Sequence, residues 1–187
     1  MLHRLTRFAA AVLLLAVVAM GPARAANDTY SPEEIMKVAT DFFGGTTEGL
    51  ASIVEKIFAD QGRPNAYIAG EEVSGAFFVG LRYGKGTLNR KATGAREIFW
   101  RGPSVGWDFG GNASKVFTLV YNLDDEEKMF RRFPGVDGSF YFVAGFGMNY
   151  QKRGGITVAP IRTGVGLRAG ANIGYLSYEK EAGVLPF

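Results

Sequence analysis

The sequence predicts a mainly β protein, a small, strongly curved, glycine-rich β-barrel with two N-terminal packing helices and one short inserted helix. Three observations lead to this prediction. After residue 66, apolar and polar residues alternate with a period of two, the pattern of strands with one apolar face. Many of the 26 glycines recur on one face of these strands, which favours a sharp bend or the close approach of another backbone. Two amphipathic helical patterns precede the strands.

The first 25 residues have the pattern of a secretory signal peptide. Arg4 and Arg7 form a basic start, residues 8–20 are apolar, and Ala23, Arg24 and Ala25 fit a cleavage site. As a helix, this apolar run spans about 20 Å, well short of the roughly 30 Å hydrocarbon core of a bilayer. We therefore expect a periplasmic protein that is cleaved after Ala25, with residues 26–187 forming a single domain.

Charge and residue types exclude several functional classes. The chain has 21 basic and 18 acidic residues, but Arg4, Arg7 and Arg24 leave with the leader, so the mature protein is close to neutral. This is not the broad positive surface of a nucleic-acid-binding domain. Cysteine is absent and the single histidine, His3, lies in the leader. The mature chain therefore lacks the thiol and imidazole groups of common nucleophilic and zinc sites, and we predict no enzyme activity, no metal and no cofactor.

Helix and strand signals follow one another along the mature chain. Ser31, Pro32 and Glu34 form the start of a helix with a capping box, predicted over about 32–43, and a second helix is predicted at about 47–61. Strands are expected at 75–84, 95–100, 115–121, 139–150 and 163–177. Turns are expected at 84–87, 110–112, 134–135 and 154–155. The turn at 84–87 resembles a phosphate-binding loop only faintly, because Val79 stands where that loop needs glycine.

A short helix is predicted at 124–133, between the strands. Four acidic residues, 124–127, precede Lys128, Arg131 and Arg132. This order suits the helix dipole, so a solvated helix face is favoured over a metal site.

Four segments resemble a known family. They are residues 78–88, 102–111, 117–122 and 133–138, and their order and spacing are similar to those of the alphaproteobacterial periplasmic family of the envelope integrity protein EipA. A more distant similarity is to SYLF-type lipid-binding domains, which share the Tyr-Gly-x-Gly-x-Leu turn. The resemblance covers nearly the whole mature chain. It implies a small periplasmic β-barrel, a role in envelope integrity and no known enzymatic activity, and it supplies no catalytic residues.

A basic segment is the strongest candidate for a binding site. Its cations are interleaved with Tyr83, Trp100 and Trp107 and have Glu97 as the one counter-charge: Arg82, Lys85, Arg90, Lys91, Arg96 and Arg101. Cations bind phosphates or carboxylates, and aromatic rings stack on sugars or lie at lipid headgroups. The alternative is ordinary solvated charge at strand ends. The predicted contacts are Arg82, Tyr83, Lys85, Arg101, Trp107 and Asp108.

The predicted function is to bind an envelope component or an envelope protein, with peripheral membrane contact and no nucleic acid. The component would be anionic or amphiphilic: an anionic lipid, lipopolysaccharide or peptidoglycan. Three alternatives stay open. One is a glycan hydrolase using carboxylates such as Asp108 and Glu72, although Glu71 and Glu72 are interpreted as solvated charge. The others are a lipocalin-like lipid carrier and a small outer-membrane barrel.

Overall fold

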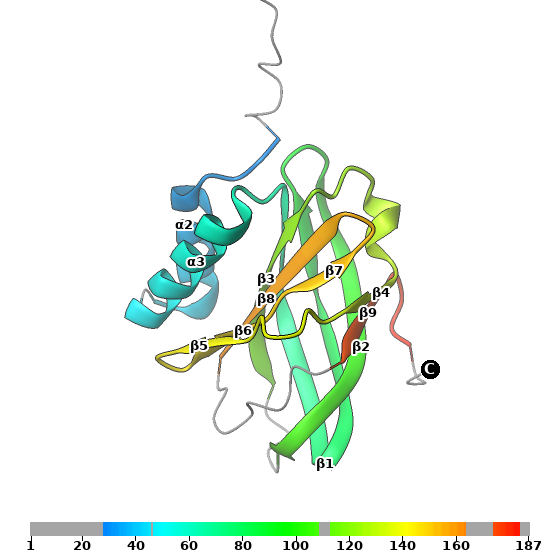
Figure 1. Ribbon diagram of the computed structural model, residues 1–187. Helices are drawn as coiled ribbons and strands as arrows, with labels where there is room; N and C mark the ends of the chain where they lie inside the picture. Colours follow the sequence, from blue (N-terminus) through cyan, green and yellow to red (C-terminus); the bar gives the residue numbers. More distant parts are fainter. Residues whose placement is uncertain (1–27, 46, 109–112, 164–173, 184–187) are drawn as a thin grey trace, which may run out of the picture.

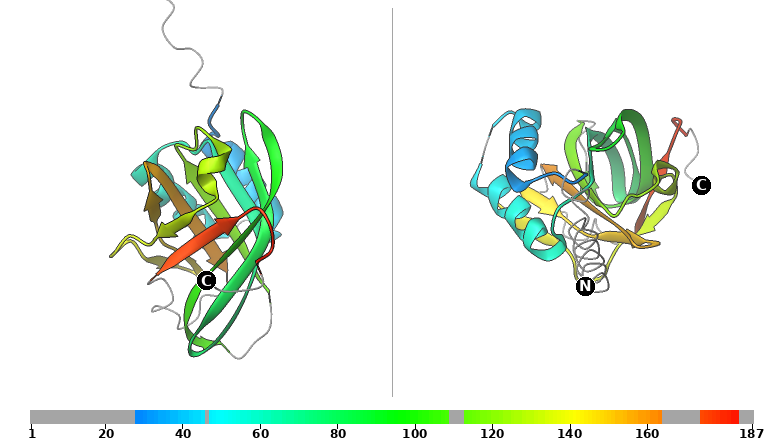
Figure 2. Two further views of the ribbon diagram at one scale, coloured as in Figure 1. Left: turned by 90° about the vertical axis from the view of Figure 1, so that its right-hand side faces the viewer. Right: turned by 90° about the horizontal axis from the view of Figure 1, so that it is seen from above.

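The computed structural model describes residues 28–45, 47–108, 113–163 and 174–183, with the backbone alone described at 74–80 and 104–108. The described chain begins with two helices, α2 (Pro32–Phe43) and α3 (Glu48–Gln61). They lie side by side on the outside of a curled sheet (Figures 1 and 2).

Both helices begin at the residues that the sequence marks. The Ser31 hydroxyl accepts a hydrogen bond from the Glu34 backbone N–H, and the Glu34 carboxylate accepts one from the Ser31 N–H, which completes the predicted capping box. The Thr47 hydroxyl caps α3 by accepting from the Leu50 N–H. These caps satisfy backbone donors that a helix start leaves open.

The strands form one antiparallel sheet in the order β4-β9-β2-β1-β3-β8-β6-β5, with β7 also paired to β8. A 3-10 helix, Glu126–Met129, precedes β4. The strand bounds are β1 (Ala66–Arg90), β2 (Gly94–Asp108), β3 (Ser114–Tyr121), β4 (Arg132–Pro134), β5 (Tyr141–Val143), β6 (Phe146–Met148), β7 (Gln151–Arg153), β8 (Ile156–Thr163) and β9 (Tyr175–Glu179).

Strand β1 doubles back on itself. A Cβ placed on Gly70 would lie 2.3 Å from the Lys85 carbonyl oxygen and 2.6 Å from the Gly86 Cα. Sixteen extended residues span about 50 Å, so the chain must reverse between Gly70 and Gly86. One arm of β1, residues 66–72, pairs with β3, and the other, residues 76–90, pairs with β2. Gly70 and Gly86 allow this close approach because glycine has no side chain, in agreement with the predicted curvature.

The curled sheet is joined at one end. Gly135, just after β4, forms a bridge with Gln151 at the start of β7, and the Val136 N–H donates to the Tyr150 carbonyl oxygen at 2.8 Å. Strand β4, at one end of the strand order, is thereby linked through β7 to β8. The described chain is therefore barrel-like, and the predicted fold class is confirmed.

Two apolar cores lie on opposite sides of the sheet, and β3 contributes to both. Its alternate residues Phe117 and Leu119 pack under α2 and α3, in the helix-covered core, whereas Val116 and Val120 face the interior of the barrel. The interior core is filled by buried side chains, among them Ile68, Leu88, Ile98, Trp100, Phe133 and Tyr178.

Two predicted segments have a different local structure. Residues 139–150 are not one strand but a hairpin, because Ala144 and Gly145 have φ values of 45° and 86° and form a two-residue turn between β5 and β6. A two-residue turn preserves the alternation on both sides, so the sequence pattern continues through it. The predicted helix at 124–133 is limited to the 3-10 helix, and Arg132–Pro134 is a strand instead, paired with β9.

The hairpin turn predicted at 84–87 is wrong. These residues lie within β1 and pair with 97–100, and the turn falls at 91–93. Gly84 has a packing role, because its Cβ would lie 1.9 Å from the Trp100 ring. The predicted turn at 154–155 is confirmed: both glycines have positive φ and connect β7 to β8. The turn at 110–112 and most of the strand at 163–177 lie outside the described residues.

Candidate binding site

The predicted contact residues of β1 lie on two faces of the strand, because neighbouring residues point to opposite sides. Arg82 is buried, with 6% of its surface exposed, and interacts with Glu72 in the barrel interior. Tyr83 and Lys85 face outward, and Arg101 joins them from β2. The structure therefore brings three of the predicted contacts together and separates Arg82 from them.

The other two predicted contacts are described only by their backbone. Trp107 and Asp108 pair with Phe77 and Ala76 near the end of β2. Their side chains lie outside the described residues, so their part in a site stays a prediction.

A pocket of about 430 Å³ lies on the outward face of β1, β2 and β9, and we call it the outer pocket. Val73, Tyr83 and Phe99 form apolar and aromatic walls, and Trp100 is reached beside Gly84. Val73 is 46% exposed. A concave surface lined by apolar and aromatic side chains is typical of a site that binds another molecule.

Ion pairs neutralise the cations at the rim of the outer pocket. Lys85 Nζ lies 2.7 Å from Glu97 Oε1, and Arg101 Nε lies 2.7 Å from Glu179 Oε1. Lys85 also lies over the Phe99 ring, 5.6 Å from its centroid. An anion that approached either cation would have to compete with a carboxylate already in place.

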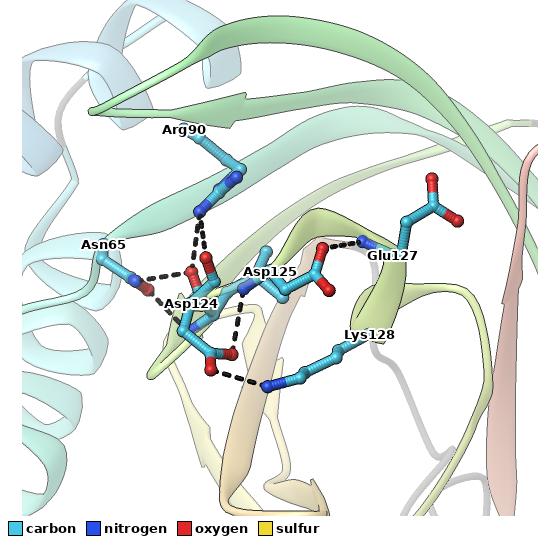
Figure 3. Close-up of polar contacts among 7 residues, drawn as sticks. Asn65, Arg90, Asp124, Asp125, Glu127 and Lys128 are labelled. Carbon is cyan, nitrogen blue, oxygen red and sulfur yellow. Dashed lines mark hydrogen bonds and ion pairs between the residues drawn. The ribbon is translucent and has the colours of Figure 1, made fainter.

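The remaining cations of the basic segment also contact groups of the protein. Lys91 pairs with Glu34 of α2, and Arg96 Nη1 lies 2.7 Å from Glu126 Oε1. Arg90 donates to the carbonyl oxygens of Leu123 and Asp124, both at 3.0 Å (Figure 3). These side chains connect the β1–β2 hairpin to α2 and to the acidic segment.

The acidic segment 124–127 is likewise engaged in internal contacts (Figure 3). Asp124 accepts from Lys128 at 2.6 Å, and the Asp125 carboxylate accepts from the Glu127 N–H. A hydrogen bond from Lys180 lowers the pKa of Glu127. These contacts agree with a segment whose acidic side chains cap the start of the 3-10 helix and form ion pairs. Within the described ranges, no three histidine, aspartate or glutamate side chains are grouped as metal ligands.

A second polar feature lies inside the barrel, and we call it the interior ion cluster: Glu72, Arg82 and Arg162. Arg162 Nε lies 3.2 Å from Glu72 Oε1, and Arg82 Nη1 lies 3.7 Å from the same oxygen. Trp100 Nε1 donates to Glu72 Oε2 at 2.8 Å, and Arg162 Nη1 donates to Asn149 Oδ1 at 3.5 Å. The sequence-based interpretation of Glu72 as solvated charge is therefore wrong.

Glu72 is ionised despite its burial. Burial by itself raises the pKa of this carboxyl, but Arg162, Arg82 and the Trp100 hydrogen bond outweigh it and lower the pKa below its usual value. A carboxylate held in this state is a poor general acid. A base or nucleophile would be ionised but would have to reach a substrate, whereas Glu72 is 6% exposed and paired with two arginines, so it gives no support to a carboxylate-based hydrolase.

Sequence reasoning missed Glu72 and Arg162 as interior residues, and it counted Trp100 among the aromatic residues interleaved with the basic segment, although Trp100 is 3% exposed. One signal was present: Glu72 continues the alternation of Ala66 and Ile68, both of which face the interior. No such signal identified Arg162 as the partner of Glu72, because 90 residues separate them in the chain.

The fold, the outer pocket and the interior ion cluster together define a class of protein. It is a β-barrel-like protein with a filled core and an apolar pocket on its outer face. Within the described ranges, no helix has the length and apolar character needed to cross a bilayer. The chain belongs to the envelope integrity protein A family, whose sequence profile matches residues 28–187. A role in envelope integrity follows from this membership.

A solved structure supports the same assignment. The crystal structure of a β-barrel-like, uncharacterized protein from Brucella abortus shares 52% sequence identity with this chain, with a TM-score of 0.78. The match covers 86% of this chain and 99% of the Brucella chain. No curated protein matches the sequence.

Proposed function

We propose that this chain is a non-enzymatic periplasmic protein that supports the envelope by binding an amphiphilic envelope component in the outer pocket. One observation carries the proposal: apolar and aromatic walls form a pocket, on a part of the sheet that neither α2 nor α3 covers (Figure 1). The family assignment and the leader pattern of residues 1–25 favour the envelope and the periplasm as its place of action.

The chemistry of the outer pocket favours an amphiphile over a simple anion. Its volume lies within the range of ligand pockets, about 300–1,000 Å³. Val73, Tyr83 and Phe99 offer apolar surface, so an acyl or other apolar segment would gain from leaving water. Lys85 and Arg101 are already paired, so a bare anion would gain little there. A lipid or lipopolysaccharide therefore fits better than a small anion.

The proposal of a non-enzymatic role rests on residue chemistry. The mature chain has neither imidazole nor thiol, and Glu72 is held ionised between two arginines. Incubating the mature protein with peptidoglycan fragments tests this part directly. Turnover that is lost in Asp108→Asn would contradict it.

Two exposed valines provide a matched test of the binding site. Val73 lines the outer pocket and is 46% exposed, whereas Val136 lies in the loop after β4 and is 38% exposed. Binding of the mature protein is measured by cosedimentation with vesicles of phosphatidylcholine and phosphatidylglycerol, and with lipopolysaccharide micelles. Val73→Asp should weaken binding at least about tenfold, because it puts a charge among apolar walls. Val136→Asp should leave binding unchanged.

Equal binding by wild type and Val73→Asp would overturn the proposal. Equal loss in both variants would also do so, because it would indicate non-specific repulsion by added negative charge. Arg82 is unsuitable for this test, since its reversal would place two acidic groups together inside the barrel.

A further inference from the structure

Within the described part of the chain, two buried donors of the barrel interior have no hydrogen-bond partner. They are Arg162 Nη2 and the Tyr178 hydroxyl. Arg162 is 8% exposed and Tyr178 is 2% exposed. Thr118 lies close to the Tyr178 hydroxyl but not in hydrogen-bonding geometry. Buried polar groups are almost always paired, so these two require an explanation.

Glu72 does not supply the missing acceptor. Its Oε1 is occupied by Arg162 Nε and lies near Arg82 Nη1, while its Oε2 accepts from the Trp100 indole. The other terminal nitrogen of Arg162, Nη1, donates to Asn149. The two N–H groups on Arg162 Nη2 are therefore left over after the carboxylate of Glu72 and the amide oxygen of Asn149 have been used.

Arg162 and Tyr178 call for the same kind of ligand atom. A guanidinium group has donors and no acceptor. Tyr178 stays neutral, because burial raises the pKa of its hydroxyl, so it too has a proton to donate. Tyr178 also lies within electrostatic reach of Arg162. A group that accepts from both and carries negative charge matches these donors best.

We propose that the interior ion cluster is an oxyanion site, in which one carboxylate or phosphate group accepts hydrogen bonds from Arg162 Nη2 and the Tyr178 hydroxyl. The site is separate from the outer pocket and does not depend on the function proposed for it. The Arg82 and Arg162 side chains are 7% and 10% exposed, whereas Arg162 Nη2 and the Tyr178 hydroxyl are themselves buried. The ligand is therefore a single charged group, either a free oxyanion or the head of a lipid, that reaches the two donors when neighbouring side chains move.

Tyr178→Phe is the informative variant, with Tyr175→Phe as its matched control. Tyr178→Phe removes a hydroxyl that makes no hydrogen bond within the described part of the chain, so folding should be kept. Tyr175 lies on the same strand, but its ring stacks on the Arg132 guanidinium at 4.0 Å. Binding of sodium phosphate and sodium acetate to the mature protein is measured by calorimetry, against sodium chloride at equal ionic strength.

Wild type and Tyr175→Phe should bind phosphate or acetate saturably, and Tyr178→Phe at least about fivefold more weakly. The melting temperature should rise with ligand concentration in the same pattern. Arg162→Gln should abolish binding, but Tyr178→Phe keeps the test decisive if Arg162→Gln does not fold. Phosphate stabilises many proteins through the solvent, so an effect that is equal in all variants does not count as binding.

The source of the oxyanion is decided by a second probe, short-chain phosphatidylglycerol. If inorganic phosphate binds saturably and phosphatidylglycerol does not, the ligand is a free oxyanion. If only phosphatidylglycerol binds, and Tyr178→Phe weakens that binding, the ligand is a lipid head. The proposal is overturned if no probe binds more strongly than chloride, or if Tyr178→Phe binds as wild type does. The first result would mean that an ordered water is enough to satisfy the two donors, and the second that the anion binds without the Tyr178 hydroxyl.

Discussion

The outward face of the sheet has two regions of opposite character. Over β3, β8 and β6 it is covered by α2 and α3, and Phe117, Leu119 and Ile161 are fully buried. Over β1, β2 and β9 it is open and forms the outer pocket. The first arm of β1 crosses from one region to the other, because Tyr67 packs in the helix-covered core and Val73 lines the pocket. Apolar side chains point outward in both regions, and the cover of α2 and α3 decides which of them are buried in a core and which stay at the outer pocket.

The largest expected effect comes from removing an aromatic ring in the covered region. Phe117 is fully buried and stacks on Tyr67 at 5.2 Å, so Phe117→Ala should lower the free energy of unfolding by about 3–5 kcal/mol. Phe99→Ala, in the open region, should lower it by about 1 kcal/mol. Urea unfolding followed by circular dichroism measures both. Similar losses would contradict the distinction between the two regions.

A comparison of Glu72 with Glu71 extends the test to the inward face. Glu72→Gln removes the carboxylate shared by Arg82 and Arg162 and should lower the free energy of unfolding by about 3 kcal/mol. Glu71→Gln, its exposed neighbour at the outer pocket, should have little effect on stability.

The same pair predicts a pH dependence. The folded-state pKa of Glu72 is lowered from 4.5, so its contribution is present above about pH 4.5 and is lost as the pH falls through the folded pKa. Unfolding midpoints at pH 6 and pH 3 should therefore differ more in wild type than in Glu72→Gln. An equal pH dependence would show that Glu72 is not held ionised.

A single methyl group tests how closely the covered region is packed. A Cβ on Gly49 of α3 would lie 2.8 Å from the Ala144 Cβ and 2.9 Å from the Val143 carbonyl oxygen. Gly49→Ala should destabilise by about 1–2 kcal/mol, because overpacking exceeds the gain in helix propensity. Adding Ala144→Gly should recover part of the loss, since it removes the contact with the Ala144 Cβ and leaves those with the two carbonyl oxygens of Val143 and Ala144. Gly45→Ala, with no atom within 4 Å of its added Cβ, is the control.

The smallest effect is expected from the Lys85–Glu97 pair at the rim of the outer pocket. Both side chains are more than half exposed, so the coupling free energy between them should be below about 1 kcal/mol and should decrease with added salt. A double-mutant cycle of Lys85→Gln and Glu97→Gln measures it. A larger, salt-independent coupling would mean that this rim is part of the stable core.

Local signals in the sequence predicted much of the fold but only part of the site. The capping box at Ser31 and the strand at 115–121 depend on near neighbours in the chain, and both are found as expected, although β3 is buried on both faces rather than on one. Tyr83, Lys85 and Arg101 share one face, but Arg82 was placed with them because a run of basic residues does not reveal which way each side chain points. The turn at Ala144 was missed because alanine rarely adopts a positive φ.

The sequence by itself determined the starts of the helices, the period-two strands, the absence of cysteine and the absence of histidine after His3, because each is a property of residue type or short-range spacing. Only the tertiary structure decided which strand faces the helices would cover, that Glu72 would meet Arg162 from 90 positions away, and that the outer pocket would remain open. These outcomes depend on contacts between distant segments, and a local pattern of residues is compatible with several such arrangements.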